Sequence, residues 1–154
     1  MFHRYQYESD IYPTLSRIPL HVRMKLDLTG IKIGLKDWLA FSIEERTVLC
    51  HLPVESEEEK QAFASYVDFL SRHYRGTRVA TTAAMSSALW NDGLEVPVPV
   101  AVAGKRAPRT PPVTIEEWRR WKFHQRYALY KTALSQSDPE QFFAVLKELR
   151  ESKH

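Results

Sequence analysis

Two stretches of the chain, residues 33–70 and 113–150, carry the same scarce residues at a constant spacing of 80 positions. The chain has four tryptophans in 154 residues, so two Trp-x7-Arg-x2-Leu stretches in register indicate an internal repeat. The repeat predicts a duplicated structural unit. The matched pairs are Trp38 and Trp118, Phe41 and Trp121, Arg46 and Arg126, Leu49 and Leu129, Phe63 and Phe143, and, upstream, Pro19 and Pro99.

The local patterns inside both stretches are typical of helices. Four segments start with Ser or Thr and have Glu three residues later, the signature of a capping box: Ser42 to Glu45, Ser56 to Glu59, Thr114 to Glu117 and Ser137 to Glu140. Apolar residues follow at helical spacing: Phe63, Tyr66, Val67 and Leu70; Phe123, Tyr127, Tyr130 and Leu134; Phe142, Val145, Leu146 and Leu149.

Proline and glycine predict where further helices begin and end. A helix should run from Pro19 to Gly30, with a weaker counterpart from Pro99 to Gly104. Residues 80–90 suit a short helix, and strand patterns are confined to 31–33 and the proline-interrupted 96–100. We therefore predict an all-α fold, a small helical domain of two related multi-helix units offset by about 80 residues.

Length and composition suggest how these units are organised. A chain of 154 residues fits a single domain, 1–154, or two small halves that share a core. We divide it into an extended N-terminal arm, a first helical unit (15–75), a connector (76–95) and a second helical unit (96–154). The pattern leaves open whether the halves pack within one chain or exchange between two, so a homo-oligomer is compatible with it.

The composition favours a cytoplasmic protein that does not span a membrane. No apolar run approaches the ~18 residues that a membrane helix needs, and residues 1–8 lack the apolar core of a signal peptide. The single cysteine, Cys50, excludes an internal disulfide framework and is expected to be a buried apolar residue.

Positive charge is concentrated in residues 104–131, although the net charge is only +3. This segment has two acidic residues, Glu116 and Glu117, and eight basic ones: Lys105, Arg106, Arg109, Arg119, Arg120, Lys122, Arg126 and Lys131. One interpretation is a solvated helix face above a buried aromatic stripe. The alternative is a nucleic-acid-binding regulatory protein in which aromatic rings stack on bases and arginines bind phosphates.

The residues typical of catalysis and metal binding are poorly represented. The six histidines, His3, His21, His51, His73, His124 and His154, are scattered without metal-ligand spacing. Neighbouring Cys50 and His51 would point about 100° apart on a helix, and no glycine-rich phosphate loop is present. We therefore expect a protein that is not an enzyme and has no cofactor and no metal site.

One long block resembles a known family. It runs Leu15-Ser-Arg-Ile18-Pro19-Leu-His-Val22-Arg23-Met-Lys25-Leu26-Asp27, then Gly30-Ile31-Lys32-Ile-Gly-Leu35 and Trp38, and then Phe41-Ser42-Ile43-Glu44-Glu45-Arg46. The block resembles the conserved nitrate-reductase-associated protein family, as do the opening Tyr5-Gln6-Tyr7-Glu8 and the later Val113-Thr-Ile-Glu-Glu-Trp118 and Gln125-Arg126-Tyr127. The family pattern leads us to expect an apolar or thiol residue before Ile18-Pro19, and Arg17 departs from that pattern.

The resemblance implies a small accessory protein of assimilatory nitrate reduction, with nitrate reductase as its protein partner. Such a protein would bind the reductase and support its maturation, cofactor insertion or activity, which requires a binding surface rather than an active site. We expect Trp38, Arg46, Trp118 and Arg126, shared by the two stretches, to form scaffold. The expected partner-binding residues are unshared bases: Arg17, His21, Arg23 and Lys25 in the first stretch, and Lys105, Arg106 and Arg109 in the second.

Overall fold

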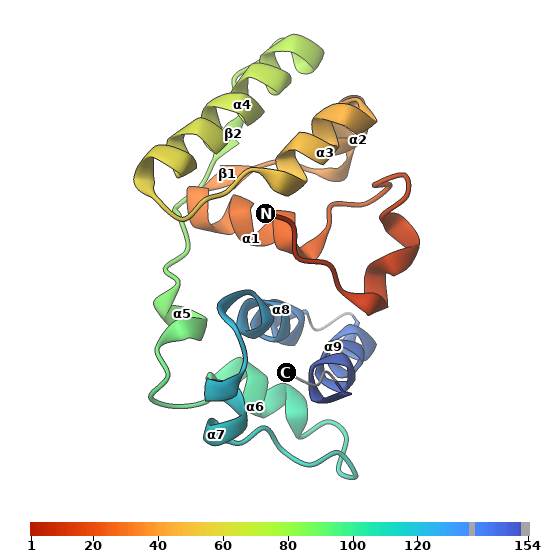
Figure 1. Cartoon of the computed structure of the whole chain (residues 1–154), viewed down its shortest axis with the longest axis vertical. Helices are drawn as coiled ribbons and strands as arrows, with labels where there is room; N and C mark the ends of the chain where they lie inside the picture. Colours follow the sequence, from red (N-terminus) through yellow and green to blue (C-terminus); the bar gives the residue numbers. More distant parts are fainter. Residues whose placement is uncertain (136–137, 152–154) are drawn as a thin grey trace. The chain divides into compact units, whose positions relative to one another are not determined.

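The computed structural model describes residues 1–135 and 138–151, and these are mostly helical (Figure 1). Two compact units divide the chain: 1–4 with 8–86, and 5–7 with 87–154. The predicted cap at Ser137 and the histidine His154 lie outside the described residues. A short 3-10 helix, η1 (Gln6–Ile11), replaces the extended N-terminal arm that the sequence suggested.

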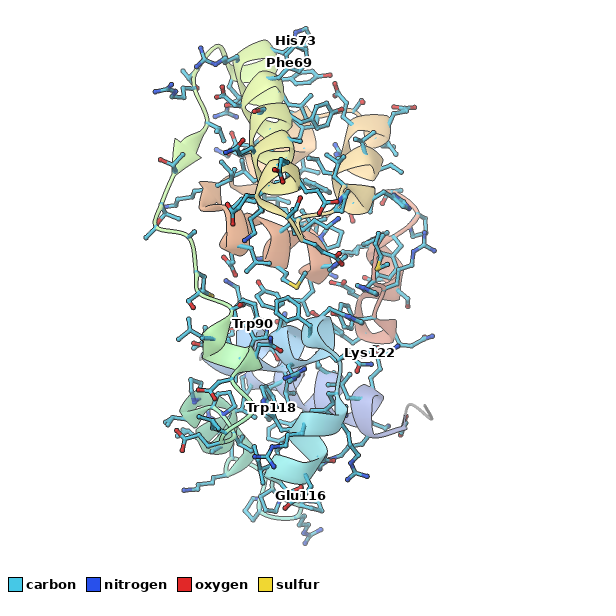
Figure 2. All side chains as sticks on the ribbon, turned by 60° about the vertical axis from the view of Figure 1, so that its left-hand side comes forward. Phe69, His73, Trp90, Glu116, Trp118 and Lys122 are labelled. Atoms are coloured by element: carbon cyan, nitrogen blue, oxygen red, sulfur yellow. The ribbon has the colours of Figure 1, made fainter. Side chains whose placement is uncertain are left out.

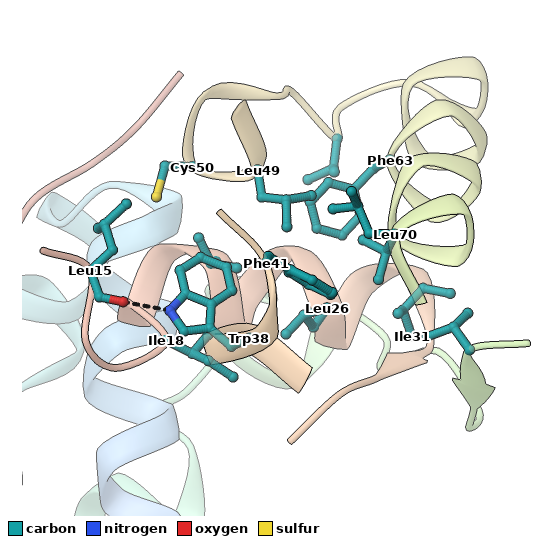
Figure 3. Close-up of a cluster of buried hydrophobic side chains, with 14 residues drawn as sticks. Leu15, Ile18, Leu26, Ile31, Trp38, Phe41, Leu49, Cys50, Phe63 and Leu70 are labelled. Atoms are coloured by element: carbon teal, nitrogen blue, oxygen red, sulfur yellow. Dashed lines mark hydrogen bonds between the residues drawn. The ribbon is translucent and has the colours of Figure 1, made fainter. Parts of the chain in front are cut away.

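The first unit contains four α-helices and two short strands. They are α1 (Leu20–Thr29), β1 (Ile31–Lys32), α2 (Leu35–Ala40), α3 (Ile43–His51), α4 (Glu57–Arg75) and β2 (Ala80–Thr81). Helix α1 contacts α3 and α4, and α2 also contacts α4. Figure 3 shows the buried apolar cluster between them, with Trp38, Phe41 and Phe63 among its largest side chains.

The predicted boundaries of the first unit's helices are confirmed. Ser42 and Ser56 each cap a helix with the reciprocal carboxylate bond of a capping box. Pro19 precedes α1 and Gly30 ends it in the left-handed conformation, with a φ of 72°. A β-carbon at Gly30 would lie 2.5 Å from the carbonyl oxygen of Thr82, so both the backbone conformation and the close approach require glycine.

The carboxyl end of α3 is capped by a buried lysine. Lys25 Nζ donates hydrogen bonds to the carbonyl oxygens of Leu49 and Cys50. The backbone amine of Met1 donates to the carbonyl oxygen of His51. Terminal helix carbonyls have no partner within their own helix, and cations at this end also interact favourably with the helix dipole. Lys25 therefore joins α1 to α3 through backbone capping.

The segment after α4 departs from the predicted helix over 80–90. Strand β2 pairs antiparallel with β1, placing Thr81 opposite Ile31. The chain then continues along the end of α1, where the N–H of Thr82 donates to the carbonyl oxygen of Gly30. Because these backbone groups bond to the neighbouring segment, only α5 (Ala88–Asn91) at the end of the predicted range is helical.

The second unit is built around α8 (Phe123–Leu134), which contacts α5, α6 (Val98–Gly104) and α9 (Pro139–Glu151). Helix α7 (Ile115–Arg120) precedes it, and half of its predicted capping box is present: Thr114 accepts from the N–H of Glu117. The Glu117 carboxylate binds Arg150 instead of completing the box. Trp90, labelled in Figure 2, is fully buried and its ring lies 5.1 Å from that of Tyr127. This tryptophan anchors α5 to α8.

The apolar stripe of α9 is confirmed, but one of the matched pairs is wrong. Phe142, Val145, Leu146 and Leu149 are all buried. Phe143, which the constant spacing pairs with the fully buried Phe63, is only partly buried. The buried positions of α4 and α9 instead correspond at a spacing of 79, because Phe142 faces the core of its unit as Phe63 does.

Within the described residues, no helix combines the length and apolar character needed to cross a membrane.

Candidate functional site

The predicted binding residues of the first unit do not form one surface. His21 and Lys25 are buried, with 4% and 1% of their surface exposed. His21 Nδ1 accepts a hydrogen bond from the N–H of His3, and Lys25 caps α3. The expectation that Lys25 lies on the surface beside Arg23 is therefore wrong, because the unpaired carbonyls of another helix draw its ammonium inward.

Burial also changes the acid–base chemistry of this cap. Desolvation lowers the pKa of Lys25 from 10.5 to about 8, and it raises the pKa of the adjacent Cys50 thiol to about 12. The fully buried Cys50 is thus held as a thiol, which confirms that it is an apolar core residue.

Arg17 and Arg23 remain exposed, but both have intramolecular partners. Arg17 forms an exposed ion pair with Asp10 at 3.4 Å. Arg23 Nε donates to the carbonyl oxygen of Ile18 at 3.2 Å. These two arginines stay candidates for partner binding on their exposure alone.

The expected scaffold residues behave differently in the two units. Arg46 donates to the carbonyl oxygens of Thr14, Trp38 and Leu39 at 2.8–3.2 Å, as the scaffold interpretation requires. Arg126 Nε is buried without a hydrogen-bond partner in the described part of the chain. Burial lowers the pKa of Arg126, which reflects the cost of desolvating its charge.

The three predicted bases of the second unit do lie together, on the loop that joins α6 to α7. Lys105, Arg106 and Arg109 are exposed, and within residues 1–135 and 138–151 none of the three has an ion pair. The loop backbone is turned by short-range bonds, for example from the N–H of Thr110 to the carbonyl oxygen of Ala107. This loop, residues 105–112, is referred to below as the basic loop.

Arg150 of α9 holds the basic loop in place, and the sequence patterns did not single it out. Its Nη2 donates to the carbonyl oxygen of Pro111 at 2.8 Å. The same guanidinium binds both carboxylate oxygens of Glu117 at 2.8 and 3.0 Å. Bidentate pairs of this kind are geometrically specific, so Arg150 fixes the loop and α7 against α9. No local pattern could have revealed a pair separated by 33 residues.

An apolar cavity of about 550 Å³ opens beside the basic loop. Its apolar lining comes from Ala107 of the loop and from Phe143 and Leu146 of α9, and Thr110, Lys147, Arg150 and Glu151 also line it. Arg106 and Arg109 are exposed and directly precede the lining residues Ala107 and Thr110 in the sequence, so the loop that lines this cavity is basic. That combination is typical of a protein-binding surface, in which an apolar centre is bordered by polar groups.

Most aromatic residues of segment 104–131 are buried, so the structure gives no support to the nucleic-acid interpretation. Trp118 and Tyr127 are fully buried, and Trp121 and Tyr130 are 9% and 8% exposed. Base stacking requires an accessible ring face, which these side chains do not offer. The interpretation of segment 104–131 as a charged face above a buried aromatic stripe is the one that the structure supports.

No group of three or more His, Cys, Asp or Glu residues with the proximity of a metal site occurs among the described residues.

Comparison with known proteins gives one match. A family model, conserved nitrate reductase-associated protein, matches residues 4–149. No curated protein and no solved structure matches the chain. The matched range covers both units and the block that carries the sequence resemblance. The chain therefore belongs to the conserved nitrate reductase-associated protein family.

Proposed function

We propose that this protein is a non-catalytic accessory protein that binds nitrate reductase and supports its maturation, cofactor insertion or activity. Family membership supports the choice of partner. The observation that carries the binding role is the basic loop, which has three exposed bases and lines an apolar cavity through Ala107 and Thr110. A cytoplasmic location is part of the proposal.

The chemistry of this surface defines the part of the reductase that it would bind. Lys105, Arg106 and Arg109 would attract carboxylates, while Phe143 and Leu146 would receive an apolar side chain. Charged rims accelerate and orient association, whereas buried apolar anchors supply most of the affinity. The proposed docking segment is therefore acidic and carries at least one large apolar residue.

Capture of purified nitrate reductase by the immobilised chain tests this surface. The variant Lys105→Glu/Arg106→Glu/Arg109→Glu should weaken capture by about tenfold or more, since like charges would then face the acidic segment. The matched control reverses three exposed bases of the first unit, Lys32, Lys36 and Arg78, and should capture normally. Equal capture by both variants and the natural chain would refute the proposed surface.

A strain that lacks this protein distinguishes a role in the maturation of nitrate reductase from a role in its activity. Normal amounts of reductase protein with low activity would indicate that cofactor insertion or electron supply fails. Reduced amounts of the protein would indicate that folding or stability of the apo-reductase fails. Unchanged amount and activity under nitrate-dependent growth would contradict an accessory role of either kind.

We also infer that the two units are copies of one ancestral unit. Helices α2 and α7 each have six residues, and an aromatic residue in extended conformation ends each of them, Phe41 and Trp121. One further residue follows each aromatic residue before the next helix begins, α3 after Phe41 and α8 after Trp121. On this view the first copy kept the scaffold and the second acquired the basic loop. Structures of family members that lack the second unit's loop would test the order of events.

A further inference from the structure

The last turns of α4 carry a cluster of exposed aromatic side chains. Phe69 is 60% exposed, and its ring stacks on that of His73 at 6.2 Å between centroids. The His73 ring in turn forms an edge contact at 4.7 Å with Tyr74, which is 39% exposed. Figure 2 labels Phe69 and His73 on this helix. The outer face of an amphipathic helix is normally polar, so such a cluster is typical of a surface that binds another protein.

Packing within the unit does not account for Phe69. The buried positions of α4 and α9 correspond at a spacing of 79, and at that spacing Phe69 corresponds to Glu148. Along α9, all of which the structure describes, the exposed residues are Pro139, Glu140, Ala144, Lys147 and Glu151. None of them is aromatic, so the equivalent helix of the second unit has the outer face that solvent favours. The exposed aromatic cluster is therefore particular to α4.

Small side chains lie on the same face as Phe69. Ser65 precedes it by one turn of the helix and Ala62 by two turns, and both are exposed. Residues at these spacings share one side of a helix, so the Phe69 ring projects beside a stretch where the surface is low. A prominent ring and a low stretch can interlock with the same face of a second copy that runs in the opposite direction.

The charges of this face are also complementary to themselves when two copies are antiparallel. The first turn of α4 is acidic and its last turn is basic, and Glu58 and Arg72 are exposed on the face that carries Phe69. Arg72 pairs with Asp68 one turn away at 2.9 Å, and exposed pairs of this kind contribute little, so Arg72 can also bind a second carboxylate. Antiparallel copies bring acidic turns to basic turns, whereas parallel copies bring like charges together. The face therefore matches a second copy of itself in both shape and charge.

We propose that two copies of this chain bind each other through α4, with the two helices antiparallel. Phe69 of each copy packs on Ala62 and Ser65 of the other, and Glu58 of each copy lies opposite Arg72 of the other. The two sets of contacts are identical, so the arrangement closes as a two-fold dimer and does not extend into a filament. Helix α4 has 19 residues and is about 28 Å long, which is enough for a continuous helix–helix contact. The proposal does not depend on binding of nitrate reductase by the second unit.

Sedimentation velocity of the full chain over a range of protein concentrations tests the proposal. The natural chain should pass from monomer to dimer as its concentration rises. Phe69→Gln should raise the dissociation constant of the dimer at least about tenfold, because buried aromatic anchors supply most of the affinity of such contacts. The matched control is Leu94→Gln, which replaces a 77% exposed apolar residue of the second unit and should leave the dissociation constant unchanged. Circular dichroism verifies that both variants fold.

Exchange of the two charges tests the antiparallel arrangement. Glu58→Arg and Arg72→Glu should each weaken the dimer by about fivefold or more, and the double variant Glu58→Arg/Arg72→Glu should restore it. Glu58 and Arg72 are about 21 Å apart along one helix, so direct contact within a single chain cannot produce such a rescue.

The proposal is overturned if the chain sediments as a monomer at every concentration, or if Phe69→Gln dimerises as tightly as the natural chain. A double charge variant that dimerises no better than the single variants would overturn the antiparallel arrangement. If the chain is monomeric and nitrate reductase slows hydrogen exchange in α4, this face binds the reductase and not a second copy.

Discussion

Each unit has a tryptophan and an arginine at matching positions in the sequence, but the hydrogen bonding of these side chains differs between the units. In the first unit, Trp38 donates to the carbonyl oxygen of Leu15 at 2.7 Å and Arg46 binds three carbonyls. In the second, Trp118 Nε1 and Arg126 Nε are buried and have no partner among the described residues. The first unit has thus used its polar groups for its own stability. The second retains unsatisfied donors and exposed bases, which are features of a region that binds other molecules.

The largest effect should come from the two arginines. Arg46→Met removes three charge-assisted hydrogen bonds to backbone carbonyls, so we expect a loss of about 3 kcal/mol in the free energy of unfolding. Arg126→Met should cost less than about 1 kcal/mol, because no hydrogen bond of Nε is lost. Urea denaturation measures both values, and equal losses would remove the contrast between the units.

The tryptophan pair should differ by a smaller amount. Trp38→Phe and Trp118→Phe remove similar volumes from fully buried sites, so their packing costs should be alike. Only Trp38→Phe leaves a carbonyl oxygen, that of Leu15, without its donor. We therefore expect Trp38→Phe to be more destabilising by about 1 kcal/mol. Greater loss from Trp118→Phe would show that its indole N–H is bonded in solution.

The smallest effect concerns the pH dependence of the first unit's lysine cap. The pKa of Lys25 is about 8 when folded and 10.5 ordinarily, so from pH 8 upward the unfolded chain binds more protons at this group and stability rises. Above pH 9, Cys50 acts in the opposite direction, because its folded pKa is about 12 and its ordinary value 9.0. Between pH 8 and 9 Lys25 should contribute a gain of about 1 kcal/mol.

Denaturation of Lys25→Met in the same pH range isolates this contribution. The variant should lack the gain between pH 8 and 9 that the natural chain shows, since methionine does not titrate. An identical pH profile in both proteins would mean that the ammonium of Lys25 is as well solvated in the folded chain as in the unfolded one.

Local patterns predicted where α1 begins and ends and where α3 and α4 begin. Ser42 and Ser56 cap helices through bonds that span three residues, and Gly30 ends α1 through its own backbone conformation. The stripe at Phe63, Val67 and Leu70 identified the buried face of α4 in the same way. Each of these features depends on interactions within one or two helical turns, so the residues that form it lie close together in the sequence.

Features that depend on distant segments were not predictable. Lys25 looked like a surface base, and its burial follows from carbonyls that lie 24 and 25 residues further along the chain. Residues 80–81 suited a helix, but pairing with β1 made them a strand. Of the candidate binding residues, the sequence correctly indicated exposed bases in the basic loop and missed Arg150, whose partner Glu117 is 33 residues away.

Hydrogen–deuterium exchange of this chain with and without nitrate reductase tests most directly whether the second unit is the binding part. We expect the reductase to slow exchange in the basic loop and in the adjoining end of α9, the segments that line the apolar cavity. The helices of the first unit should exchange at unchanged rates. Slowed exchange confined to the first unit, with the basic loop unaffected, would show that the second unit is not the binding part.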